Sequence, residues 1–325
     1  MVQTGVQKMS FDSGIEGEYE DSHIINAVYS FFNNCDFISN NSNYNKNTFY
    51  DRTVSGRNPN FPILPIGLIP RLEYSRKHLN FISSQFNRPY IMLNLDLVER
   101  LSNNGITAHD FYPFGNIITT STIHDDNLCN YNIEREIKII KKFEPAWHIP
   151  CDYPVYTEDC DEGRKWFIDA LVEDTLYFMD SVRDTSIGIL PLVKGINETE
   201  WEMSTFPFKE RGISHFAFYA EQYFGSKKGK NDNLMIEHIR CLVSTCDVDY
   251  LLLIGYQSSF RLQGFPPEVQ AFAGKRWIKG SKLNSYTQEQ ARVEYLNWER
   301  HFHEQDTKRQ SVLNLRDENI LMEEC

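Results

Sequence analysis

The stretch from Phe143 to Tyr156, FEPAWHIPCDYPVY, places a carboxylate soon after a short apolar run. Ala146 to Pro150 is typical of a buried strand, and Asp152 follows it closely. A carboxylate just past the carboxyl end of a core strand lies where parallel α/β folds bind their ligands. Taken alone, Asp152 is better explained as the cap of a helix that starts near Asp161, or as a turn residue before Pro154. Other runs that end in the same way favour a shared site.

Polar residues follow the other apolar runs as well. They are Ser121, Thr122, His124, Asp125 and Asp126 after NIITT, Lys194 and Gly195 after ILPLV, Glu221 and Gln222 after HFAFYA, Tyr256, Gln257 and Ser258 after LLLIG, and Lys275 and Arg276 after the last run. In a barrel of parallel strands such residues converge on one mouth. Carboxylates with a lysine, amides and a glycine suit a polar heterocycle, or general acid and base catalysis. Any one of them is explained equally by a solvated loop, so the recurrence carries the prediction.

Two of these groups suggest a more specific chemistry. The segment from His124 to Asp126 offers imidazole and carboxylate ligands, but one short cluster is better explained as a solvated loop, and no metal is expected. Lys194 could form a Schiff base, although pairing with Asp152 or Glu221 explains it better. The seven cysteines include no C-x-C or C-x-x-C pattern, so a structural zinc site is not expected, nor is any cofactor.

Apolar strand patterns alternate with helical patterns along most of the chain. The expected strands are 62–68, 89–95, 116–121, 147–150, 187–193, 215–220, 250–255 and 271–277, and the expected helices are 73–85, 133–143, 163–182, 198–211, 233–245, a turn at 266–269, and 287–306. Strands that are apolar throughout are typical of a parallel sheet with both faces covered. The pattern predicts an α/β fold, a (β/α)8 TIM barrel. An open doubly wound sheet is the alternative, weakened because no G-x-G-x-x-G follows the first strand.

This pattern divides the chain into three parts. Residues 1–57, with many asparagines, form an N-terminal extension or lid, residues 58–285 the TIM-barrel domain, and residues 286–325 a C-terminal helical segment. The scattered cysteines, the lack of a signal-peptide pattern and the absence of a long apolar run predict a cytoplasmic protein without a membrane span.

The formal net charge of −12 limits the partners, because neutralising phosphates needs lysine and arginine. Contact with DNA or RNA therefore requires a local basic patch. The most basic short stretch is GKRWIKGSK, with Lys275, Arg276, Lys279 and Lys282, and a second one contains Lys227, Lys228 and Lys230. An ordinary solvated loop explains either patch about equally well.

The order of these motifs resembles the tRNA-guanine transglycosylase superfamily, which includes relatives that insert 7-deazaguanines into DNA. The similarity runs from about Pro62 to Trp277. FPILPIG resembles the family's M-P-V-G strand, YIMLNLDLV its L-x-N-x-Y-H-L, NIITTST the strand with T-D-S-G-G-F-Q, IPCDYP the strand whose aspartate reads the base edge, LPLVKG the I-V-Q-G strand, HFAFYAEQYF the strand with Y-A-V-G-G-L, and AFAGKRW the strand with M-F-D-C-V. The resemblance implies a (β/α)8 barrel that exchanges a base at C1′ of a nucleoside.

The chain departs from the family where the family carries its chemistry. Thr120 stands at the position of the proton-handling aspartate, Ala273 at that of the nucleophilic aspartate, and Lys194 at that of the base-binding glutamine. Glu221 and Gln222 replace a Gly-Gly pair, and the C-x-C-x-x-C zinc motif is missing. Displacement at C1′ with retention needs a carboxylate that forms a covalent glycosyl intermediate, which alanine cannot do.

Three functions remain open. The first is a divergent base-exchange enzyme acting on a guanine or 7-deazaguanine-type base in DNA or tRNA, with Asp152 reading the base and Glu221 or Asp125 as nucleophile or base. In this hypothesis Thr120, Ser121, Lys194, Gly195, Gln222 and Tyr256 bind substrate, and Lys275, Arg276, Lys279 and Lys282 bind phosphate. The second is a non-catalytic barrel that binds nucleic acid or serves as a partner subunit in a homo- or hetero-oligomer. The third is an unrelated barrel enzyme acting on a small polar metabolite.

Overall fold

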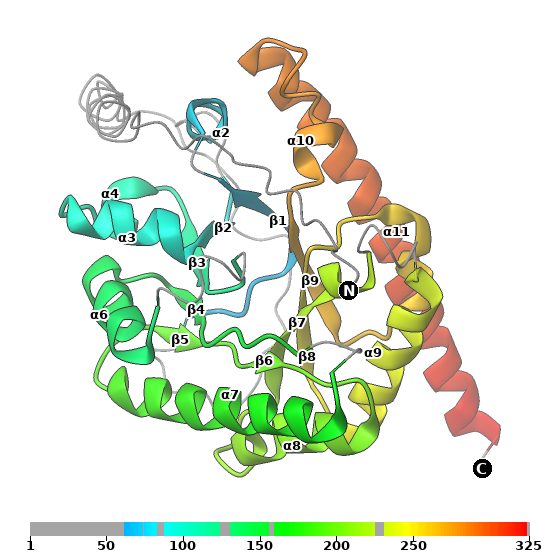
Figure 1. The fold of residues 1–325 in the computed structure, drawn as a ribbon. Helices are drawn as coiled ribbons and strands as arrows, with labels where there is room; N and C mark the ends of the chain where they lie inside the picture. The colour runs from blue at the N-terminus through cyan, green and yellow to red at the C-terminus, as the bar shows by residue number, and fades with distance from the viewer. Residues whose placement is uncertain are drawn as a thin grey trace, which may run out of the picture. The chain divides into compact units, whose positions relative to one another are not determined.

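The computed structural model describes residues 62–73, 75–82, 88–123, 131–155, 159–224 and 231–323, with side chains described as far as residue 311. Within these ranges the chain forms a curled parallel sheet of nine strands with helices around its outside, an α/β fold of half-barrel form (Figure 1). The expected extension at 1–57, the segment from His124 to Asp126 and the basic cluster at 227–230 lie outside the described residues.

The nine strands are short and buried. They are β1 (Gly67–Leu72), β2 (Tyr90–Asn94), β3 (Asn116–Thr120), β4 (Trp147–Ile149), β5 (Gly188–Ile189), β6 (Leu192–Val193), β7 (His215–Tyr219), β8 (Tyr250–Ile254) and β9 (Val269–Gly274). The hydrogen-bonded order is β5-β4-β3-β2-β1-β9-β8-β7-β6, and each pairing is parallel. Because helices cover the outer face and side chains fill the inner one, strands such as β1 and β8 are buried at every position. The prediction of a parallel α/β fold is confirmed.

Helices follow most of the strands. They are α2 (Arg76–Phe81), α3 (Leu95–Asn103), α4 (Ala108–Phe111), α6 (Ile133–Phe143), α7 (Asp161–Ser181), α8 (Glu198–Lys209), α9 (Asp232–Cys246), α10 (Trp277–Gly280) and α11 (Gln288–Glu323), with 3-10 turns η1 (Ala220–Tyr223) and η2 (Ser259–Gly264). Local caps explain several starts. The side chain of Asn132 accepts from the backbone of Arg135 at 2.9 Å, and that of Asn197 from Glu200 at 3.0 Å.

The first expected strand, 62–68, is wrong, because β1 begins at Gly67. Proline has no N–H for a strand ladder, so PILP is a poor strand despite its apolar character. Its carbonyl groups instead accept hydrogen bonds from three core side chains. Tyr90 donates to Ile63 at 2.6 Å, Trp147 donates to Ile63 at 2.9 Å, and Tyr250 donates to Pro65 at 2.7 Å. The apolar run is therefore held by side chains of β2, β4 and β8.

Four further differences from the expected elements concern where strands and helices begin or end. The strand expected at 271–277 is β9 (Val269–Gly274), and Trp277 begins α10 instead. The turn expected at 266–269 lies earlier, as η2. Helix α3 was not expected, because YIMLNLDLVERL is one continuous apolar pattern that hides the change from strand to helix. Helix α11 also runs beyond the expected 287–306.

Helix α11 runs beside the sheet and past it (Figure 1). It is fixed by Arg309, whose side chain is fully buried and whose guanidinium donates to the carbonyl groups of Pro266 and Val269 at 2.9 and 2.7 Å. Asp306 pairs with the same group at 2.7 Å. The helix is thus held to the loop that leads into β9.

Replacing Arg309 with methionine should lower the free energy of unfolding by about 3 kcal/mol, because two backbone acceptors and Asp306 lose their partner. Urea denaturation measures this. Arg300 lies exposed on the same helix, so Arg300→Met should stay within about 0.5 kcal/mol of wild type. Equal losses in the two variants would contradict this role for Arg309.

Candidate functional site

Polar side chains from the carboxyl ends of four strands form one connected group, called here the strand-end cluster: Arg71, Asp152, Lys194, Tyr219 and Glu221. Oδ1 of Asp152 lies 2.7 Å from Nζ of Lys194. That ammonium lies 5.5 Å from the centre of the Tyr219 ring. The Tyr219 hydroxyl donates to Oε2 of Glu221 at 2.9 Å, and Oε1 of Glu221 lies 3.8 Å from Nη1 of Arg71. The ends of β1, β4, β6 and β7 therefore meet in one polar group, which contains the expected Asp152, Lys194 and Glu221 together with Arg71 and Tyr219.

Ser121 fixes the backbone that carries Asp152. The backbone N–H of Ser121 donates to the carbonyl of Ile149 at 3.1 Å, which continues the pairing of β3 with β4. The Ser121 hydroxyl lies 3.3 Å from the same carbonyl and accepts from the N–H of Asp152 at 3.0 Å. The side chain of Asp152 is only 8% exposed, so its carboxylate is held close to Lys194 and away from bulk solvent.

The loop after β6 is equally well held. The backbone N–H of Lys194 donates to the hydroxyl of Ser204 at 3.0 Å. Gly195 has φ of 128°, and a Cβ there would lie 2.7 Å from Cβ of Glu200. Glu200 accepts from the N–H of Ile196 at 2.9 Å and pairs with the buried Arg164 at 3.0 Å. Gly195 was expected to bind substrate, but its close packing on α8 explains why it is glycine.

Glu221 lies at the open end of the cluster. Its side chain is 38% exposed, compared with 6% for Lys194. Gly255 has φ of 92°, and a Cβ at this position would lie 2.1 Å from Cγ of Glu221. Glycine just past β8 therefore leaves the space that the Glu221 side chain occupies.

Arg71 is a residue of the cluster that the sequence analysis missed. It is buried, its Nε donates to Oδ1 of Asn94 at 2.7 Å, and its Nη2 donates to the carbonyl of Thr122. Its own carbonyl accepts from the indole of Trp277 at 3.0 Å. Among the described residues, Nη1 makes no hydrogen bond, and it lies 3.8 Å from Oε1 of Glu221. The signal was a single arginine inside the apolar run GLIPRL, hidden because the strand was expected earlier in the chain.

The charges of the cluster are balanced, with two cations facing two carboxylates. Burial raises the pKa of the Tyr219 hydroxyl above its usual value, and the charge of Glu221 and its hydrogen bond raise it further, with Arg71 acting in the opposite direction. Tyr219 therefore keeps its proton at neutral pH and acts as a hydrogen-bond donor. A balanced site with several donors and acceptors suits a neutral polar ligand better than a strongly charged one.

Other expected site residues lie apart from these contacts. Tyr256 packs its ring against Phe224 and Phe265, with ring centres 5.9 and 5.2 Å apart, and burial raises its pKa to about 12. Thr120 is buried, and its hydroxyl lies 2.9 Å from that of Thr122. Gln222 follows Glu221 in η1 and is half-buried. Tyr256 is therefore a packing residue in the contacts described, and Asp125 lies outside the described residues.

The last strand carries no acid at its end. Ala273 is fully buried in β9. The amide of Gln257, which follows β8, donates to the carbonyl groups of Ile69 and Phe272 at 3.0 and 3.2 Å. An amide side chain thus contacts the backbone of both β1 and β9 beside Ala273.

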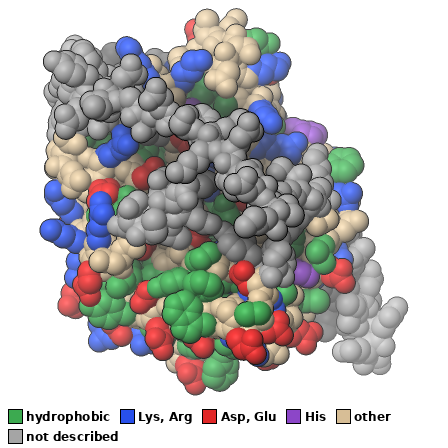
Figure 2. Space-filling model, viewed as in Figure 1, with side chains coloured by type: hydrophobic (Ala, Val, Ile, Leu, Met, Phe, Trp, Pro, Cys, Tyr) green, Lys and Arg blue, Asp and Glu red, His purple; other side chains and the backbone are tan. Residues whose placement is uncertain are grey.

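The basic patch after β9 is partly neutralised. Lys275 lies 2.7 Å from Glu73, and Lys282 lies 3.4 Å from Glu294. Arg276 and Lys279 are exposed and make no ion pair among the described residues. In Figure 2, acidic side chains gather at the bottom of the view, where α7 and α8 lie in Figure 1, while Lys and Arg lie at the top and along the left edge.

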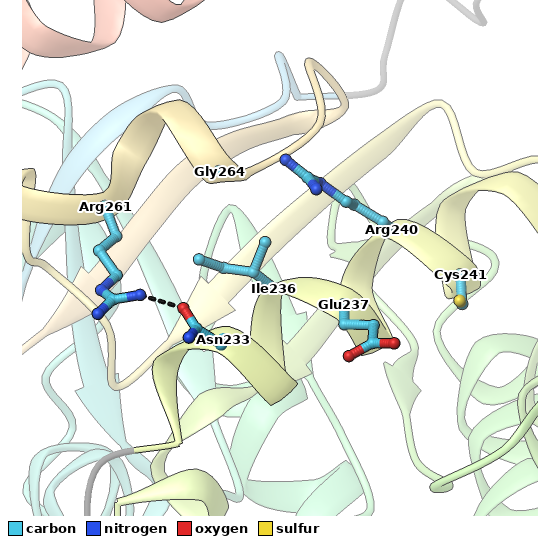
Figure 3. A pocket seen from close by; sticks show the side chains of 7 residues that line it. All are labelled: Asn233, Ile236, Glu237, Arg240, Cys241, Arg261 and Gly264. Atoms are coloured by element: carbon cyan, nitrogen blue, oxygen red, sulfur yellow. Dashed lines mark hydrogen bonds between the residues drawn. The ribbon is translucent and has the colours of Figure 1, made fainter.

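A separate hollow of about 690 Å³ lies between α9 and η2 (Figure 3). Asn233, Glu237 and Arg240 line it from α9, and Arg261 from η2, with the Arg261 guanidinium donating to Asn233. None of the cluster residues lines this hollow, so it is a feature of the helical surface rather than of the strand ends.

Within the described parts of the chain, no group of three or more His, Cys, Asp or Glu side chains is placed to hold a metal ion. None of the helices in the described residues is long and apolar enough to cross a membrane. No protein-family model and no curated protein matches the chain.

Proposed function

We propose that the chain is a base-exchange enzyme that acts on a guanine-like base at C1′ of a nucleoside in DNA or tRNA. The observation that carries this proposal is the strand-end cluster itself. It brings two carboxylates, a lysine and a protonated tyrosine together at the carboxyl ends of parallel strands. Parallel α/β barrels bind their substrates at that edge.

The two carboxylates differ in exposure and in their partners, and this difference supports a different role for each. Asp152 is 8% exposed and paired with Lys194 at 2.7 Å, which suits a fixed acceptor for the donor edge of a guanine-like base. Glu221 is 38% exposed and oriented by Tyr219 and Arg71, which suits a nucleophile that must reach a sugar. In the first step an oxygen of Glu221 bonds to C1′ while the bond from C1′ to the base breaks. The departing base leaves with the bonding electron pair and takes up a proton from water. In the second step the incoming base loses its N–H proton to water, bonds to C1′ and displaces Glu221, which becomes a carboxylate again.

The proposal includes a closed (β/α)8 barrel, in which β5 and β6 are two halves of one strand. They are consecutive in the chain and separated only by Leu190 and Pro191. The N–H of Leu190 donates to the carbonyl of His148 in β4 at 2.9 Å, and the carbonyl of Pro191 accepts from Ala217 in β7 at 2.9 Å. With β5 and β6 merged, the nine strands become eight. This closure would place Asp152 and Lys194 on neighbouring strands.

The proposed partner is a nucleic acid that approaches over α10. Arg276 and Lys279 supply the exposed positive charge, while Lys275 and Lys282 are already engaged by carboxylates. Phosphate contacts depend on such charges. The described cysteines, Cys151, Cys160, Cys241 and Cys246, are free thiols, which supports a reducing compartment such as the cytoplasm.

Incorporation of labelled guanine or a labelled 7-deazaguanine into tRNA and into DNA tests the proposed reaction. Wild type should incorporate label into one of the two, and Asp152→Asn should reduce the rate by about 100-fold or more, because the amide has no charge to pair with Lys194 and only one acceptor oxygen. Asp180→Asn, on the exposed end of α7, is the matched control and should leave the rate unchanged. Equal rates for Asp152→Asn and wild type would overturn the role of Asp152.

A non-catalytic barrel that binds a base is the second candidate, and one observation favours it. Ala273 stands near the end of β9, so this strand end carries no carboxylate. In that case the chain binds a base through Asp152 and Lys194 without exchanging it. Saturable binding of guanine together with no incorporation into either nucleic acid would select this second function.

A further inference from the structure

A second buried polar chain lies between β4 and the helices outside it. Nε2 of His148 is 2.8 Å from Oε1 of Glu136 in α6, and Nδ1 is 2.8 Å from the hydroxyl of Thr119 in β3. The side chains of His148 and Glu136 are 0% and 5% exposed. The ring of His148 also packs against Phe178 of α7, with ring centres 4.8 Å apart. The proposed reaction makes no use of these groups, so their burial needs another explanation.

The hydrogen-bond roles in this chain follow from the chemistry of its members. As a carboxylate, Glu136 only accepts, so Nε2 of His148 donates to it. The Thr119 hydroxyl lies 3.3 Å from the carbonyl of Trp147, and it donates either there or to Nδ1. In the first case Nδ1 donates to the Thr119 hydroxyl, and in the second it accepts from that hydroxyl. In both cases His148 fixes the orientation of the Glu136 carboxylate.

The same carboxylate reaches the backbone next to Asp152. The N–H of Cys151 donates to Oε1 of Glu136 at 3.4 Å. Cys151 has φ of 59°, in the left-handed region that a residue with a Cβ adopts at a cost. Among the described residues, the other positive-φ residues with a side chain are Glu144, Asp247 and Lys282, at or just after helix ends. Cys151 is thus unusual in lying beyond a strand, and strained backbone persists where its surroundings hold it.

We propose that Glu136 is a positioning residue that holds Cys151 in the left-handed conformation and so directs Asp152 toward Lys194. The role of Asp152 in reading a base rests on the function proposed above, whereas its position does not. Without the bond to Glu136, residue 151 relaxes toward negative φ, and the chain that follows carries the Asp152 carboxylate away from Lys194. His148 acts one step further back, by orienting Glu136.

The thiol of Cys151 is not needed for this role. Burial raises its pKa well above the usual value, and the charge of Glu136 raises it further, so the thiol stays protonated and neutral. Replacing Cys151 therefore tests the backbone conformation rather than a reactive sulfur. Glycine adopts positive φ readily, whereas alanine does not. This difference provides a rescue experiment with a matched control.

The reactivity of Lys194 toward an amine-acylating reagent, followed by peptide mass spectrometry, reports whether Asp152 is in place. In wild type the ammonium is buried and paired, so acylation should be slow relative to the exposed Lys165. Glu136→Ala should accelerate acylation of Lys194 about tenfold, matching the strain released at Cys151. Asp152→Asn, which removes the partner directly, is the positive control. If Glu136→Ala does not fold, Glu136→Asp takes its place. The shorter side chain moves the carboxylate away from the N–H of Cys151 with less change in volume, and it should also accelerate acylation of Lys194.

The rescue decides between positioning and general destabilisation. Adding Cys151→Gly to Glu136→Ala should return the acylation rate of Lys194 to within about twofold of wild type, because glycine adopts the left-handed conformation without the steric cost that a Cβ imposes. Adding Cys151→Ala should leave it fast. An unchanged Lys194 rate in the Glu136 variants, or equal rescue by glycine and alanine, would overturn the proposal. Because no base or nucleic acid is used, a failure of the proposed function leaves this result intact.

Discussion

Replacing Lys194 with methionine should lower the free energy of unfolding by about 3–5 kcal/mol. The variant leaves the Asp152 carboxylate, which is 8% exposed, without the ammonium that lies 2.7 Å away in the native protein. A buried charge without a partner is far more destabilising than the loss of an exposed ion pair. Urea denaturation at pH 7 measures the change. Adding Asp152→Asn to Lys194→Met should recover most of the loss, since the double variant has no charge to bury.

The control is an ion pair of similar length on the surface. Arg183 lies 2.8 Å from Asp180, with side chains 74% and 44% exposed. Arg183→Met should therefore change the free energy of unfolding by less than about 0.5 kcal/mol. If Lys194→Met had an equally small effect, or if the double variant recovered nothing, Asp152 and Lys194 would not form a buried ion pair in solution.

Replacing Glu221 with glutamine should reduce base exchange by about 10⁴-fold or more, because an amide cannot form the covalent bond to C1′. Binding of the free base should change little, since Asp152 and Lys194 are untouched. Single-turnover incorporation of labelled base measures the first effect, and equilibrium binding measures the second. Glu210→Gln, at the end of α8, is the control and should exchange at the wild-type rate.

A different result would show that a residue other than Glu221 is the nucleophile. If Glu221→Gln retained exchange within about tenfold of wild type, Glu221 would act only by orienting its neighbours. Asp125, which the sequence also offers, would then be the next carboxylate to replace. A loss of base binding as large as the loss of exchange would instead mean that Glu221 belongs to the binding surface.

The parallel sheet and the meeting of Asp152, Lys194 and Glu221 could be predicted because they follow from periodicity. Runs such as YLLLI are apolar throughout, and the residues after them reach a common edge. The bounds of Ile133–Phe143 were predicted as the structure has them, since Asn132 gives a local start signal. The need for glycine at position 255 could not be predicted from sequence. The Glu221 side chain fills the space that a Cβ at this position would occupy, and Glu221 is distant from Gly255 along the chain.

Arg71 and the chain from Thr119 to Glu136 could not be predicted, for related reasons. The position of Arg71 depends on where β1 begins, and the apolar segment before it resembles a strand but lacks the N–H groups for one. His148 looks like any polar residue in WHIP, and its partners come from α6 and β3. Contacts of this kind depend on which helix covers which strand, and one sequence does not contain that information.

Binding of free guanine, measured by isothermal titration calorimetry, tests the central claim most directly, because it needs neither a nucleic acid nor turnover. The account predicts one base bound per chain by wild type, binding weakened about 100-fold or more in Asp152→Asn, and wild-type binding in Asp180→Asn. Guanine that does not bind wild type, or that binds Asp152→Asn equally well, would contradict a base-binding site at the strand-end cluster.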